Sequence, residues 1–145
     1  MKLFFLLLMP LLFSCAKPNY VNPTDLKDNT TPSQTTCPFY FSEERLCLST
    51  KWITYPTEEK LGVLVMKFYA EGFPDRPVTP RLDPAVKLWM PSMGHGSSPV
   101  VITKLGDETY QASEIYFIML GAWEIRYQLK SNNEVIEEQI QNITL

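Results

Sequence analysis

The chain has 145 residues, a formal net charge of −3 and 45% hydrophobic residues, and its basic residues form no cluster. Nucleic-acid-binding proteins present basic patches, so this composition excludes nucleic acid as an expected partner. The length beyond Thr36 suffices for one folded domain and not for two.

The first fourteen residues have the layout of an export signal. A single lysine precedes an apolar run over residues 3–13, and a serine comes just before Cys15. A membrane helix needs about 20 apolar residues, so residues 1–14 are expected to be a removed signal peptide rather than a retained anchor. The sequence Leu12-Phe13-Ser14-Cys15 resembles the lipobox of bacterial lipoproteins, which implies that Cys15 is lipidated. The alternative is a secreted protein with a free Cys15.

Residues 15–36 are predicted to be a flexible tether. From Ala16 to Thr36 the segment is rich in Pro, Asn, Thr and Asp and has too few large apolar residues to bury a core. Because Ala rather than Asp follows Cys15, the lipobox resemblance further implies an outer-membrane anchor, with the protein facing the periplasm. The expected domain covers residues 37–145.

Cys37 and Cys47 are the two cysteines that remain beside Cys15. In an exported protein, an even pair so close in sequence predicts a disulfide bond. A redox-active or metal-binding pair is the alternative, which the spacing disfavours because the sequence has no CxxC motif.

The domain is predicted to be all-β. Polarity alternates most cleanly from Ala122 to Lys130, which places Trp123, Ile125, Tyr127 and Leu129 on one face. Leu64, Met66, Phe68 and Ala70 likewise share one face of the segment 62–71. Further strands are predicted at residues 47–55, 85–90, 100–104, 109–117 and 135–143, and one helical turn at 43–46. About seven short strands without an amphipathic helix indicate an immunoglobulin-like antiparallel β-sandwich.

One segment, from Leu88 to Pro99, carries residues that a sandwich does not need for folding. It holds Met90, Met93 and the single histidine, His95, within six residues. Thioether and imidazole ligands suit Cu(I), a soft ion, whereas hard cations prefer carboxylates and zinc usually takes more His, Cys or acidic ligands. Met119, at the end of another predicted strand, can reach the same end of the sandwich and complete the site.

Structural explanations for the same residues stay open. Met90 follows Val86 and Leu88 at even spacing, which is typical of the core face of a strand, and methionine fills core gaps well. Met119 can pack as an apolar residue at a strand end. His95 can serve as a hydrogen-bonded loop histidine, which is the commonest role of a single histidine.

Two segments resemble a known family. The sequence LWMPSMGHGSSPV, followed by YFIMLGAWEIRYQL, is similar to the YtkA-like and FixH-like family of small exported β-sandwich domains. The similarity covers most of the chain from about Gly62 to Leu129; Leu120 stands where the family often has proline. The residues on its two motifs are Met90, Pro91, Met93, Gly94 and His95, and Met119, Gly121 and Trp123. The resemblance implies a role near copper-handling or cytochrome oxidase assembly proteins.

Two functions therefore compete. The first is a membrane-tethered protein that binds or transfers Cu(I) with Met90, Met93, His95 and Met119 as ligands. The second is a metal-free interaction module, in which the loop and neighbouring Trp89 contact an envelope partner. No enzyme activity is expected. Within each acid pair, Glu58-Glu59 and Glu137-Glu138, adjacent strand residues point to opposite faces and cannot act as a catalytic dyad. The serines near His95 would need it as a base, and no nearby Asp or Glu in the sequence orients the His95 ring.

Overall fold

The computed structural model describes residues 37–57, 59–106 and 108–145, all within the unit Pro32–Leu145. The predicted signal peptide, the lipidation site at Cys15 and the predicted tether lie outside the described residues. Ten strands form in the described part of the chain: β1 (Phe39–Phe41), β2 (Leu46–Thr54), β3 (Gly62–Ala70), β4 (Phe73–Pro77), β5 (Asp83–Met90), β6 (His95–Gly96), β7 (Val101–Gly106), β8 (Thr109–Ile115), β9 (Ala122–Ser131) and β10 (Glu134–Thr144).

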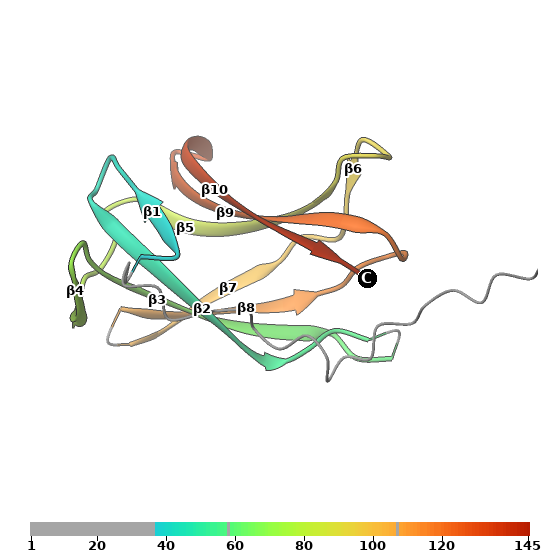
Figure 1. The fold of residues 1–145 in the computed structure, drawn as a ribbon, viewed down its shortest axis with the longest axis horizontal. Coiled ribbons are helices and arrows are strands. Elements are labelled where there is room, and N and C mark those ends of the chain that lie inside the picture. Colours follow the sequence, from blue (N-terminus) through green and yellow to red (C-terminus); the bar gives the residue numbers. More distant parts are fainter. Residues whose placement is uncertain (1–36, 58, 107) are drawn as a thin grey trace, which may run out of the picture. The chain divides into compact units, whose positions relative to one another are not determined.

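The strands form two antiparallel sheets that pack face to face, as Figure 1 shows. One sheet has the order β1-β2-β3-β8-β7, with β4 added on β3, and the other has the order β10-β9-β5-β6. The described residues contain no helix long and apolar enough to span a membrane. The prediction of an all-β sandwich is confirmed.

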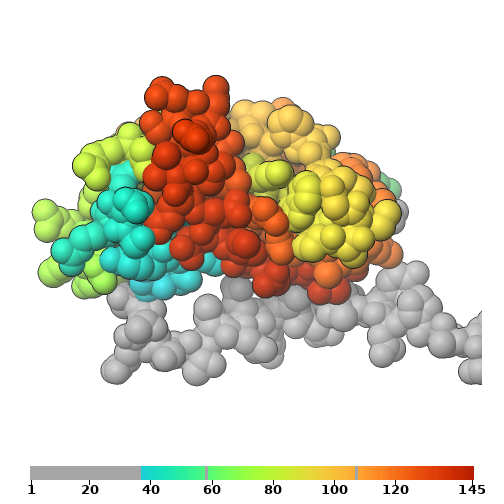
Figure 2. All heavy atoms as spheres, turned by 90° about the horizontal axis from the view of Figure 1, so that it is seen from above, coloured from blue at the N-terminus to red at the C-terminus, as the bar shows by residue number. Residues whose placement is uncertain are grey.

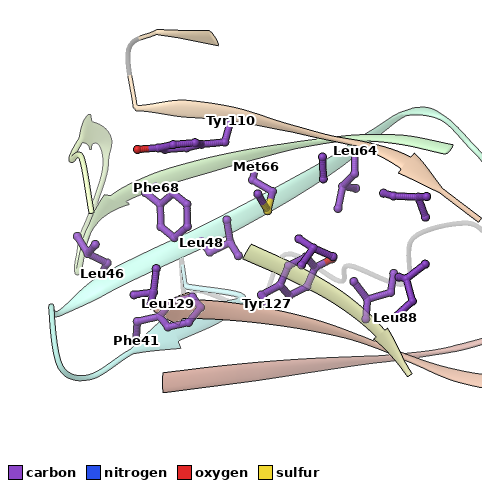
Figure 3. Close-up of a cluster of buried hydrophobic side chains, with 14 of the residues drawn as sticks. Phe41, Leu46, Leu48, Leu64, Met66, Phe68, Leu88, Tyr110, Tyr127 and Leu129 are labelled. Atoms are coloured by element: carbon purple, nitrogen blue, oxygen red, sulfur yellow. The ribbon is translucent and has the colours of Figure 1, made fainter. Parts of the chain in front are cut away.

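Side-chain alternation places one face of each sheet in the core (Figure 3). On β9 the predicted inner residues are all buried, and on β3 Leu64, Met66 and Phe68 are buried while Lys67 is exposed. Burying a large apolar side chain contributes about 1.5–3 kcal/mol, so these alternating rows of buried side chains account for the packing of the two sheets against each other. The largest fully buried side chains are Trp123, Tyr127, Phe41, Phe68, Leu48, Leu64, Met66, Leu88, Ile115, Ile125 and Leu129.

All seven predicted strands are present, and three short ones were missed. The missed strands β1, β4 and β6 have three, five and two residues, too few for a clear alternation of polarity. The helical turn predicted at residues 43–46 is wrong. Phe41 pairs with Leu46, so the four residues between them must reverse the chain, and Arg45 does so with a positive φ of 53°.

The predicted disulfide between Cys37 and Cys47 is confirmed, with Cα atoms 5.0 Å apart. Cys47 is fully buried in β2, and Cys37 lies just before β1. The bond therefore fastens the first residue of the described chain to the start of β2, where Cys47 pairs with Tyr40 of the edge strand β1.

Candidate functional site

The segment that holds the predicted ligands is the hairpin of β5 and β6. Met90 pairs with His95 across this hairpin, and the backbone N–H groups of Met93 and Gly94 donate to the Met90 carbonyl at 3.2 and 3.0 Å. Gly94 has a φ of +65°, a conformation that glycine adopts without strain, and so closes the turn. The yellow atoms of the β5–β6 hairpin lie at the surface beside the red and orange atoms of β9 and β10 (Figure 2).

Met90 and His95 project to the same face of the sheet. Directly opposed residues of an antiparallel pair share a face, with Cβ atoms about 4.5–5.5 Å apart. That face is the core face, because Met90 is 2% exposed and continues the buried row of Val86 and Leu88. The structural explanation of Met90 as a core residue thus holds, and His95 lies half-buried beside it.

One ring nitrogen of His95 is occupied by a backbone contact. Its Nδ1 lies 3.2 Å from the carbonyl oxygen of Gly96. Since a carbonyl oxygen can only accept, this hydrogen bond requires Nδ1 as the donor, and in the neutral ring that tautomer leaves the lone pair on Nε2. Histidines that bind metals usually donate their second ring N–H to a carbonyl or carboxylate in this way.

The loop between β8 and β9 closes over the same end of the sandwich. Trp123 is 1% exposed, and its indole N–H donates to the Met119 carbonyl at 3.0 Å. Its ring lies 6.4 Å from the His95 ring and 5.4 Å from the Phe117 ring, both edge to face. Trp123 thus contacts both the hairpin and the loop.

The thioether of Met90 reaches this loop as well. A Cβ atom built on Gly121 would lie 3.0 Å from the Met90 Cε. Gly121 is held in place by two backbone hydrogen bonds with Leu145, at 3.1 and 3.0 Å. Met90 therefore packs between its partner His95 and the segment that carries Met119.

The four predicted ligands lie at three depths. Met90 is buried, His95 is half-buried, and Met119 and Met93 are 41% and 58% exposed. The structure brings together Met90, His95 and the loop of Met119, whereas Met93 lies on the turn of the hairpin. Trp123 was predicted as an inward-facing strand residue and a motif position, and Phe117 as the end of a strand, but neither was predicted as part of the site. Their aromatic rings on either side of Met119 in the sequence were a signal for such a part.

Metal binding by other donors finds no support in the described residues. In residues 37–57, 59–106 and 108–145, no three His, Cys, Asp or Glu side chains are grouped so that they could hold a metal ion. Cys37 and Cys47 are joined to each other. The soft donors at this end of the sandwich are the thioethers of Met90 and Met119 and the imidazole of His95.

Three of the polar residues considered for catalysis, Ser97, Glu137 and Glu138, have other contacts. Ser97 donates its hydroxyl to the Tyr116 carbonyl. Glu137 accepts from the backbone N–H groups of Ser42 and Glu43, at 2.6 and 3.0 Å, while Glu138 lies 3.5 Å from the guanidinium of Arg126. Glu58 lies outside the described residues.

Trp89 lies on the face of β5 opposite to Met90. The ammonium group of Lys87 is 4.5 Å from the centre of its ring, and the guanidinium carbon of Arg126 is 5.4 Å away. These cations pack against Trp89, so this side chain does not share a surface with His95.

An exposed apolar segment borders the site. Ile118, Met119 and Leu120 are 43%, 41% and 69% exposed, and they line a groove of about 460 Å³ together with Pro56, Thr57, Tyr116, Phe117 and Leu145.

Comparison of the chain with family models, curated proteins and solved structures finds no match.

Proposed function

We propose that this protein is a membrane-tethered envelope protein that binds or transfers Cu(I). The proposed ligands are the imidazole Nε2 of His95 and the thioethers of Met90, Met119 and Met93. The observation that carries the proposal is the direct pairing of Met90 with His95, whose Nδ1 is directed to the Gly96 carbonyl and whose Nε2 is free of that bond. Exposed methionines by themselves would not support it.

The donor set fits Cu(I) by its chemistry. Thioether and imidazole are soft and intermediate ligands, and Cu(I) accepts a small number of them. Bound there, the ion would be held in its reduced state by sulfur. The buried Met90 and half-buried His95 would form the inner part of the site, and the exposed sulfurs of Met119 and Met93 would be the first that a partner's ligands could reach.

We propose with it the cellular setting that the sequence indicates. Lipid on Cys15 would anchor the protein to the outer membrane, facing the periplasm, after removal of residues 1–14. The partner would be a copper-handling or oxidase-assembly protein. The two segments that resemble the YtkA-like and FixH-like family support this setting, since they are the hairpin and the loop that meet around Trp123.

We further propose that the sandwich is immunoglobulin-like. The strand orders β2-β3-β8-β7 and β10-β9-β5 run in the same sequence as the ABED and CFG sheets of immunoglobulin constant-type domains. In this correspondence β5 takes the place of strand C and β9 that of strand F, so the proposed site lies between the β5–β6 hairpin, at the end of strand C, and the loop that leads into strand F.

A metal-free interaction module is the second candidate. The exposed segment Ile118–Leu120 and its groove favour it, because exposed apolar patches mark contact surfaces in soluble domains. Its contact surface would exclude Trp89, which is covered by Lys87 and Arg126.

Titration of the full-length protein with Cu(I) against a competing chelator tests the two candidates. The wild type should withdraw one equivalent of Cu(I), and a Met90→Leu/His95→Ala double variant should withdraw none. Met66→Leu is the matched control, since Met66 is equally buried but lies on β3, and leucine nearly conserves the volume of methionine.

Failure of the wild type to compete for Cu(I) would reject the copper proposal and leave the interaction module. Equal binding by the wild type and the double variant would reject this ligand set. If the double variant does lose Cu(I) binding, single Met93→Leu and Met119→Leu variants rank the contributions of the two exposed sulfurs to the affinity.

A further inference from the structure

Trp123 makes two contacts that a residue buried only for core packing would not need. Its ring is buried on the inner face of β9, but its indole N–H is directed to a carbonyl in the loop between β8 and β9 rather than to its own sheet. The same ring lies edge to face with His95 on β6, which comes from the opposite side of β5. One side chain therefore contacts the backbone of one proposed ligand and the ring of another.

The hydrogen bond has a physical consequence for the loop. A buried N–H that loses its acceptor costs more free energy than the bond itself contributes, so the Met119 carbonyl is held against the indole. Phe117 packs on the same ring at 5.4 Å, and the backbone of Gly121 is bonded to Leu145. Between these points the backbone of Met119 has little freedom to move away from His95.

We infer that Trp123 is a positioning residue of the proposed site: its indole N–H fixes Met119 at a set distance from His95 and Met90. This inference rests on the proposed Cu(I) function for its consequence in binding. A residue that serves the core alone would be replaceable by another aromatic ring. Phenylalanine keeps the ring but cannot donate the hydrogen bond to Met119.

A double-mutant cycle in Cu(I) affinity tests the inference in the full-length protein. Trp123→Phe should weaken Cu(I) binding about fivefold, the equivalent of one ordinary hydrogen bond. In the Met119→Leu background, which retains the carbonyl but lacks the sulfur, Trp123→Phe should cause no further loss. Trp52→Phe is the matched control, because Trp52 lies on β2, in the other sheet, and its ring packs against Tyr55 at 5.1 Å.

Two results of the cycle would overturn the inference. One is an affinity of Trp123→Phe equal to that of the wild type. The other is the same fivefold loss with and without the Met119 sulfur, since a general loss of stability would act in both backgrounds. If circular dichroism shows that the Trp123→Phe chain does not fold, benzothienylalanine at position 123 removes the N–H while keeping the shape of the ring. Trp52 and Trp89 are first replaced with phenylalanine, so that the analogue enters the chain at position 123 alone.

A measurement without metal separates this inference from the proposed function. In the metal-free protein, Trp123→Phe should lower the order parameter of the Met119 methyl group and speed hydrogen exchange of the Gly121 amide, which is bonded to Leu145. If the wild type binds no Cu(I), the proposed function fails and this measurement decides the positioning role. Unchanged methyl order and unchanged exchange would overturn the role of Trp123.

Discussion

Replacement of Gly121 by alanine tests the contact that joins Met90 to the loop of Met119. Gly121 has a φ of +136°, which side-chain-bearing residues rarely adopt, at a cost of about 1–3 kcal/mol. The new Cβ would also lie 3.0 Å from the Met90 Cε, closer than the usual 3.5–4.0 Å between carbon atoms. We expect a total loss of about 3 kcal/mol in the free energy of unfolding, of which about 1 kcal/mol comes from Met90.

Gly106→Ala is the matched control for the backbone contribution. Gly106 has a φ of +110°, and a Cβ there would have no atom within 4 Å. This variant should lose about 2 kcal/mol, from backbone strain alone. At about 5 °C of melting temperature per kcal/mol for a domain of this size, the two variants should differ by about 5 °C.

Urea unfolding, followed by far-UV circular dichroism, measures these changes in the wild-type and Met90→Ala backgrounds. Once the Met90 side chain is shortened, the cost of Gly121→Ala should fall to that of Gly106→Ala, which gives a coupling of about 1 kcal/mol. An identical cost of Gly121→Ala in both backgrounds would refute the argument. Met90 would then not pack against the loop, and the geometry behind the proposed Cu(I) site would be lost.

Two further predictions concern the fold that supports the site. Replacing Cys37 and Cys47 with alanine should lower the free energy of unfolding by about 3 kcal/mol, because the bond closes a loop between cysteines 10 residues apart. A reductant should destabilise the wild type but leave this variant unchanged. A wild type whose stability is insensitive to reduction would contradict the prediction. Burial raises the pKa of the Tyr127 phenol, so the unfolded chain ionises first, and stability that is present below about pH 10 should be lost as the pH rises further. Urea unfolding between pH 9 and 11 should give a shallower decline for Tyr127→Phe, and equal slopes would show that Tyr127 contributes nothing.

The strands could be read from the sequence where the polarity alternated. The row Trp123, Ile125, Tyr127 and Leu129 is buried as its spacing predicted. The missed strand β6 shows the limit of this reading, since its two residues, His95 and Gly96, have no period of their own. They are held in the sheet because they pair with Met90 and Trp89 across a tight turn.

The candidate ligands could be named from the sequence, but their arrangement could not. Met90 fitted the core face and the metal site equally well, and its burial at 2% agrees with both. What distinguishes Met119 from Met93 is their surroundings. Trp123 holds the backbone of Met119, whereas the backbone N–H of Met93 donates to Met90 within the same hairpin.

By itself the sequence determined the all-β class, the disulfide and the inward faces of the long strands, because these depend on residues close together in the chain. The tertiary structure decided which strands are neighbours. Between Met90 and the loop of Met119 the chain passes through β7 and β8, which belong to the other sheet. Met90 lies beside Gly121 of that loop because β9 pairs with β5. Such pairing is selected by burial over two whole sheets, and alternation within a single strand carries no information about its partner.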